Sequence, residues 1–126
     1  MQLHVRPGDE LPIYRQIVRQ ISDAIAGGHV GPGEKLPSHR ELAVQAVVAP
    51  LTVKKAYDEL EREGLIETVR GRGTFVSDRA RPVRADEVRE RLREPARRLL
   101  QQALLLGIDF DHVVRVLEEM RKEIEP

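Results

Sequence analysis

Six of the seven Lys and Arg residues between positions 35 and 72 lie where they could bind phosphate groups and base edges. They are Lys35, Arg40, Lys54, Lys55, Arg70 and Arg72. Lysine and arginine neutralise phosphates, and both donate hydrogen bonds to guanine in the major groove. A single exposed cation is most simply a solvated side chain. These residues therefore predict nucleic-acid binding only if the fold brings them to one surface.

The overall charge makes this condition strict. The chain has 21 Lys+Arg and 21 Asp+Glu in its 126 residues, so it has no net basic field that would steer it toward DNA. Any nucleic-acid surface would have to be local, with the acidic side chains kept on other faces.

Catalytic and metal-binding chemistry have no matching group of residues in the sequence. The four histidines, which share no ligand spacing, are His4, His29, His39 and His112. The chain has no cysteine, so it forms neither a disulfide nor a thiolate metal site. We expect no enzyme activity, no metal and no cofactor. No apolar run approaches the ~20 residues of a membrane span and no signal peptide is recognised, so we expect a cytoplasmic protein without a membrane partner.

Two helices are predicted ahead of the main cationic segment. Isoleucines recur every four positions within residues 12–26 and predict an amphipathic helix, with Pro12 in its first turn and Gly27-Gly28 at its left-handed C-terminal cap. Ser38 followed by Glu41 matches a capping box, in which Ser38 caps a short helix and Glu41 reaches back to it. Arg40 lies in the first turn of that helix, where backbone N–H groups also favour phosphate, and we expect both Ser38 and Arg40 to contact DNA there.

A further helix, predicted from about Pro50 to Glu63, has the pattern of a DNA reader. Its buried face is expected to hold Val53, Ala56, Tyr57 and Leu60. The N-terminal part of its outer surface then carries Leu51, Thr52, Lys54 and Lys55, and the acids Asp58, Glu59, Glu61 and Glu63 lie farther along. DNA readers of this type use the N-terminal part of the helix, so the cations stand where phosphates would be.

Two short strands, residues 65–70 and 74–77, are predicted around a glycine-rich hairpin tip. At this tip Arg70 and Arg72 flank Gly71, which suits phosphate or minor-groove contact. Lys35 precedes the Ser38 cap and is a further candidate. The order of the elements predicts a winged helix-turn-helix, mainly α with a small β-hairpin wing, over residues 1–78.

Two sequence motifs run through this segment. They are Pro32-Gly33-x-Lys35-Leu36-Pro37-Ser38-x-Arg40-Glu41-Leu42-Ala43 and Ala56-Tyr57-x-x-Leu60-Glu61-x-Glu63-Gly64-Leu65-Ile66. With them, residues 11–77 resemble the DNA-binding domain of the GntR family of bacterial transcription regulators. The motif Val48-x-Pro50-x-Thr52-Val53 and the short tail resemble its YtrA-like subfamily. The resemblance implies that Arg40, Thr52, Lys54 and the tip around Gly71 contact DNA, and that the tail dimerises.

The turn before the predicted reading helix departs from the family pattern. Much of the family has Gly where this chain has Val47, and Val is poorly suited to a left-handed conformation, so we expect a different turn backbone. Ala49 cannot cap the helix through a side-chain oxygen, a loss of about 1 kcal/mol. Pro50 and Leu51 replace polar residues of the family, but Leu51 is suited to contact a thymine methyl group.

Residues 79–126 predict a polar linker and a helical tail. Pro95 should kink or restart the first tail helix, and Asp109 should cap the last one, with Ile108 and Val113 as a hydrophobic staple. The apolar stripes comprise Leu92, Leu99, Ala103, Leu106, Val113, Leu117, Met120 and Ile124. Two helices rarely bury both stripes, so we expect dimerisation through this tail. The alternative is a monomer whose tail packs on its own winged domain.

Together these patterns predict a sequence-specific transcription regulator, with a repressor favoured, that binds an inverted-repeat operator in double-stranded DNA as a homodimer. Thr52, Lys54 and Lys55 would enter the major groove. Arg40 would hold phosphate and the wing arginines would clamp the DNA. One alternative is a winged-helix interaction module that binds DNA without sequence preference. Another is a regulator that senses a small molecule at the dimer interface, although the sequence identifies no effector.

Overall fold

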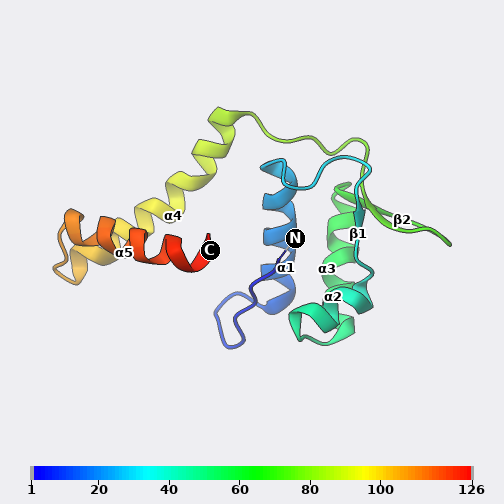
Figure 1. The fold of residues 1–126 in the computed structure, drawn as a ribbon, viewed down its shortest axis with the longest axis horizontal. Coiled ribbons are helices and arrows are strands. Elements are labelled where there is room, and N and C mark those ends of the chain that lie inside the picture. The colour runs from blue at the N-terminus through cyan, green and yellow to red at the C-terminus, as the bar shows by residue number, and fades with distance from the viewer. Residues whose placement is uncertain (1, 126) are drawn as a thin grey trace. The chain divides into compact units, whose positions relative to one another are not determined.

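The computed structural model describes residues 2–125, which form five helices and one small sheet (Figure 1). The elements follow one another as α1 (Ile13–Ala26), β1 (Lys35–Leu36), α2 (His39–Ala46), α3 (Pro50–Arg62), β2 (Ile66–Val69), β3 (Gly73–Val76), α4 (Ala85–Leu105) and α5 (Phe110–Ile124). The chain divides into two compact units, with the boundary between Val83 and Arg84. No helix within residues 2–125 is long and apolar enough to cross a membrane.

The core of the first unit lies where α1 and α2 pack against α3 (Figure 1). All four side chains predicted for the inner face of α3 are buried. They meet Ile17 and Ile21, which are fully enclosed on the isoleucine face of α1. Because aliphatic side chains at helical spacing fill this core, the position of α3 is fixed by its inner face, which leaves its outer face free for contacts.

The ends of α1 differ in detail from the prediction. Pro12 is the N-cap residue rather than a first-turn residue, because its carbonyl accepts the first helical hydrogen bond from the Gln16 N–H at 3.1 Å. At the other end Gly27 keeps a right-handed conformation. Gly28 alone takes the left-handed one, with φ +80°, and so reverses the chain.

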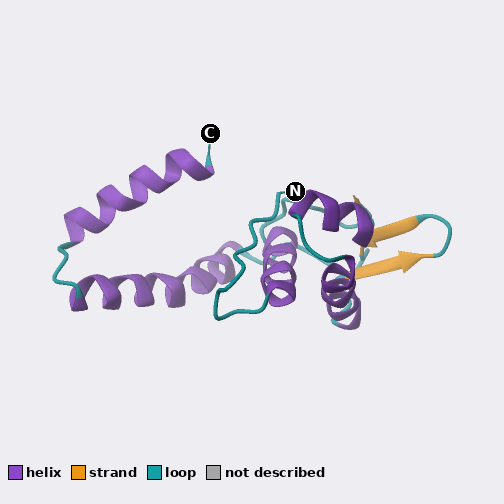
Figure 2. Ribbon diagram, turned by 90° about the horizontal axis from the view of Figure 1, so that it is seen from below, coloured by secondary structure: helices purple, strands orange, loops and turns teal. Residues whose placement is uncertain are grey.

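The sheet has a third strand that the sequence pattern did not predict. Its order is β1-β3-β2, and both pairs are antiparallel. The two-residue strand β1 pairs with β3 in the register Lys35↔Phe75 and Leu36↔Thr74. The predicted hairpin of β2 and β3 is present and forms the wing (Figure 2). The base of the wing is thereby tied to the segment that leads into α2.

The N-terminal arm lies along α1, held by two glutamine side chains. Gln20 binds both the N–H and the carbonyl of His4, at 2.9 and 2.8 Å. The buried Gln16 binds the N–H and the carbonyl of Arg6 and the carbonyl of Leu11. Each of these side-chain amides thus both accepts hydrogen bonds from the backbone of the arm and donates hydrogen bonds to it, and Leu3 and Val5 pack against the core.

The second unit is a hairpin of α4 and α5. The helix α4 continues through Pro95, so the predicted restart at that residue does not occur. The predicted cap of α5 is present, because the Asp109 carboxylate accepts a hydrogen bond from the His112 N–H at 2.9 Å. The two partners of the predicted staple, Ile108 and Val113, line the same groove between the helices.

Candidate nucleic-acid interface

The start of α2 is fixed by its cap. Ser38 Oγ accepts a hydrogen bond from the Glu41 N–H at 3.1 Å, as predicted. The second half of the capping box is not formed among residues 2–125, since no hydrogen bond joins the Glu41 carboxylate to the Ser38 N–H. The cap leaves Arg40 exposed in the first turn, beside free helical N–H groups.

The turn between α2 and α3 corrects one expectation. Val47 takes the left-handed conformation, with φ 56° and ψ 51°, instead of avoiding it. The turn is held by hydrogen bonds from the Val47 N–H to the Val44 carbonyl at 3.3 Å and from the Val48 N–H to the Ala43 carbonyl at 3.0 Å. These bonds complete a Schellman motif, which requires a left-handed residue at this point whatever its side chain. Val47 is the one described non-glycine residue with positive φ.

The first turn of α3 is capped by backbone alone. Ala49 is the N-cap residue and provides no side-chain hydrogen bond, as predicted, and Pro50 begins the helix. Leu51 follows with 77% of its surface exposed. Thr52 is half-buried and Lys54 is exposed. The predicted outer surface at the N-terminal end of α3 is therefore open to solvent.

The two lysines of α3 have different neighbours. Lys54 Nζ forms an ion pair with Asp58 at 3.1 Å, one helical turn along. Both side chains are about half exposed, so the pair contributes little to stability and can open for a phosphate. Lys55 Nζ instead lies 4.1 Å from the centre of the Tyr14 ring on α1, a cation–π contact. This contact gives Lys55 a packing role between α1 and α3 that its sequence position did not indicate.

Tyr57 joins α3 to the segment that precedes α2. Its hydroxyl donates a hydrogen bond to the Pro37 carbonyl at 2.7 Å. Burial raises the pKa of Tyr57 above its ordinary value, and the nearby Glu41 carboxylate raises it further. The hydroxyl consequently stays protonated and remains a donor, which sets the spacing between α3 and the start of α2.

The wing carries the remaining predicted cations. Arg70, Gly71 and Arg72 are exposed at its tip, and the Arg72 N–H closes the turn on the Val69 carbonyl at 2.9 Å. Gly73 has φ +124°, and a Cβ atom there would lie 2.9 Å from the Lys35 Cε. Lys35 thus passes over the base of the wing, a position that depends on the unpredicted strand β1.

None of the ten predicted DNA-contact residues is buried. Eight are exposed, and Ser38 and Thr52 are half-buried. They come from β1, the starts of α2 and α3 and the wing tip, which are the parts that a winged helix-turn-helix turns toward DNA. Within the described part of the chain, no group of His, Cys, Asp and Glu side chains could hold a metal ion.

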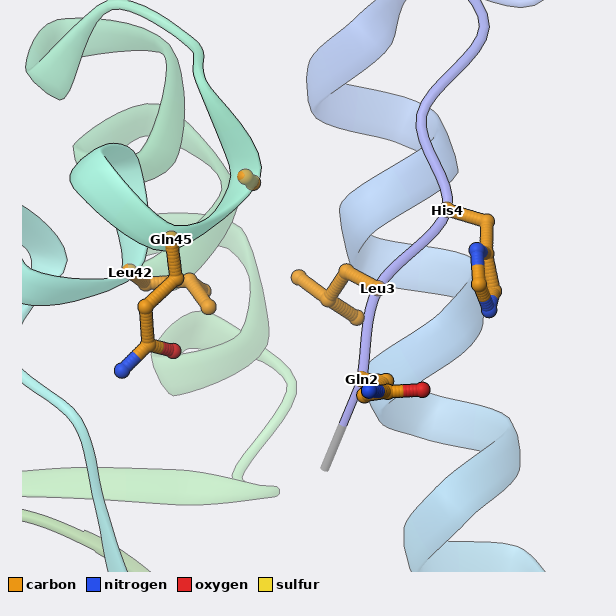
Figure 3. A pocket seen from close by; sticks show the side chains of 6 residues that line it. Gln2, Leu3, His4, Leu42 and Gln45 are labelled. Carbon is orange, nitrogen blue, oxygen red and sulfur yellow. The ribbon is translucent and has the colours of Figure 1, made fainter.

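A hollow of about 360 Å³ lies between the N-terminal arm and α2 (Figure 3). Leu3 points from the arm toward α2, where Leu42 and Gln45 face it. His4, Gln2 and Ala46 complete the lining, which has no carboxylate, lysine or arginine. None of the predicted DNA-contact residues belongs to this lining.

The helical core, the exposed start of α3 and the cationic wing define a winged helix-turn-helix DNA-binding protein. Residues 13–76 match the family described as bacterial regulatory proteins, gntR family. The chain belongs to this family and is a DNA-binding transcription regulator. Transcription regulators are not an enzyme class.

Three similar proteins extend the comparison. The chain is 37% identical over 123 residues to the HTH-type transcriptional repressor YtrA of Bacillus subtilis (strain 168), covering 98% of this chain and 95% of that protein. The structure of YtrA from Sulfolobus acidocaldarius, a GntR-family transcription factor, is 35% identical with a TM-score of 0.55, over 98% of this chain and 100% of that chain. The DNA-binding domain of AraR in complex with operator ORX1 is 38% identical with a TM-score of 0.54, over 61% and 99% of the two chains.

Proposed function

We propose that this regulator is a repressor that binds an inverted-repeat operator as a homodimer. The observation that carries the DNA part is the open N-terminal end of α3, where Leu51 and Lys54 are exposed while the acids follow farther along. The similarity to AraR, whose domain was solved with an operator, supports sequence-specific contact. The similarity to the repressor YtrA supports repression.

The contact residues then have distinct roles. Thr52 and Lys54 enter the major groove beside Leu51, and Lys54 exchanges Asp58 for a phosphate or a base edge. Lys55 holds α3 against α1 through its contact with the Tyr14 ring, and it contacts DNA only if it leaves that ring. Ser38 holds the end of α2 so that Arg40 binds phosphate. Arg70, Gly71, Arg72 and Lys35 hold the wing against the DNA backbone.

The dimer part of the proposal rests on the tail. An apolar groove of about 380 Å³ runs between α4 and α5. Of the eight predicted stripe residues, only Ala103 and Val113 are buried within one chain. The others remain exposed, namely Leu92, Leu99, Leu106, Leu117, Met120 and Ile124. A second copy would remove this apolar surface from water, which is the main driving force of protein association. Residues 79–126 would then serve as the dimerisation tail beside a DNA-binding domain of residues 1–78.

The same groove also favours a second candidate, a regulator with a small-molecule effector. Its volume is within the range of ligand sites, and Gln102 and His112 are the polar residues in its lining. A ligand in this groove would raise the melting temperature of the protein and change its DNA affinity together. A dimer without an effector would show neither change with a library of small apolar compounds.

The proposal is tested by selection from a random duplex pool at about 150 mM salt, because DNA affinities depend steeply on salt. We expect an enriched inverted repeat and a dimer by light scattering. Lys54→Glu and Arg72→Glu should bind the selected duplex more weakly than the parent. Arg19→Glu on α1 changes the net charge equally and serves as the control. Equal binding by all three variants would mean that the surface is wrongly assigned, and uniform weak binding without enrichment would favour the non-specific interaction module.

A further inference from the structure

Few side chains at the start of α3 can read bases through hydrogen bonds. Ala49 and Pro50 carry no polar side-chain atom, and Lys55 is turned to the Tyr14 ring. Thr52 is half-buried, and Lys54 is free for DNA only when its exposed ion pair with Asp58 opens. The most prominent side chain of the first turn is therefore an apolar one, Leu51.

An apolar surface precedes Leu51 in the chain. Leu51, with 77% of its area exposed, directly follows Pro50, the last of the apolar residues of α2, the turn and the helix start that line a hollow of about 440 Å³. These residues are Ala43, Val44, Val47, Val48, Ala49 and Pro50. No water-binding side chain interrupts this surface, so its contact with another apolar group releases water at both sides.

In the major groove the apolar group that differs between base pairs is the C5 methyl of thymine. We propose that Leu51 is a specificity-determining residue that recognises a thymine methyl group in each operator half-site. Cytosine has a hydrogen at C5 in place of this methyl group and so offers Leu51 no apolar contact. Leu51 thus selects thymine over cytosine by its attraction to the methyl group. This inference rests on the proposed function, because it requires α3 to lie in the major groove.

The test replaces thymine by deoxyuridine, which removes the methyl group and keeps every hydrogen-bonding atom. The probe is the half-site selected from the random pool, with one thymine replaced at a time. For the parent protein we expect about a fourfold loss of affinity at one position, as for one buried methyl(ene) group, and little change at the others. Replacement in both half-sites should cost a dimer about fifteenfold, the square of that factor.

The protein variants identify the side chain that senses the methyl group. Leu51→Ala and the nearly isosteric Leu51→Asn should bind thymine and uracil duplexes equally well at that position. Both should fold, because the side chain is mostly exposed, and a melting curve checks this. Val44→Ala, which shortens another exposed apolar side chain of the surface, should keep the parent's uracil sensitivity.

The outcomes separate the inference from the proposed function. An enriched half-site whose uracil duplexes all bind like thymine would overturn the methyl contact and leave the sequence-specific regulator intact. The same follows if Leu51→Ala keeps the uracil sensitivity of the parent. A pool without enrichment would overturn both the sequence readout and the role of Leu51.

Discussion

Replacing Val47 by glycine should stabilise the protein, against the usual effect of glycine. Val47 occupies the left-handed region at φ 56°, where a β-branched residue is rarely found. That conformation costs about 1–2 kcal/mol for a residue with a Cβ atom. Glycine removes this strain but adds about 0.5–1 kcal/mol of entropy to the unfolded chain. Since Val47 is 88% exposed, little packing is lost.

The net effect of Val47→Gly is a gain of about 0.5–1 kcal/mol in the free energy of unfolding. For a chain of this size, that raises the melting temperature by about 3 °C. Val47→Asn should gain about 1 kcal/mol, because asparagine tolerates the left-handed region and adds less unfolded-state entropy than glycine. Differential scanning calorimetry measures both variants against the parent.

The control is Val44→Gly in the last turn of α2. Val44 is 80% exposed but helical, so glycine there should lower the free energy of unfolding by about 0.5 kcal/mol. The two glycine variants are therefore expected to move the melting temperature in opposite directions. A common decrease of similar size would refute the strain assigned to Val47. Operator affinity should not change in Val47→Gly, since the turn already has the backbone that glycine prefers.

Three further predictions follow from single contacts. Tyr57→Phe should lower the free energy of unfolding by about 1 kcal/mol in urea titrations, because the Pro37 carbonyl loses its donor. Since the pKa of Tyr57 is raised on folding, the parent should also lose stability above about pH 10, where the Tyr57 hydroxyl of the unfolded chain ionises. The variant lacks this hydroxyl and should lose less stability over that pH range. Ser38→Ala should cost about 1 kcal/mol through the lost cap of α2, and Ser38→Asp, which restores an acceptor, should recover most of it. Leu117→Glu places a charge in the tail groove and should shift the sedimentation coefficient from that of a dimer to that of a monomer. The control Glu118→Gln should remain dimeric. A dimeric Leu117→Glu protein would mean that the tail groove is not part of the dimer interface.

Local sequence patterns were sufficient for the helices and the wing. Isoleucine spacing predicted α1, and the spacing of apolar residues predicted the buried face of α3. The Ser38 and Asp109 caps were also predicted, because an N-cap hydrogen bond spans only three residues. The match to the gntR family rests on the same local features, so the class of protein was accessible from the sequence.

Details of the site required the tertiary structure, because their partners are distant in the chain. Strand β1 exists only because Lys35 and Leu36 meet β3 some 40 residues later, and no two-residue run has a period of its own. The position of Lys55 along the helix predicted a DNA contact, and only the packing of α1 on α3 placed its side chain over the Tyr14 ring. Val47 was expected to avoid a conformation that the Schellman hydrogen bonds impose. Sequence periodicity determined which side of each helix is buried, whereas long-range packing decided which neighbour each exposed side chain meets.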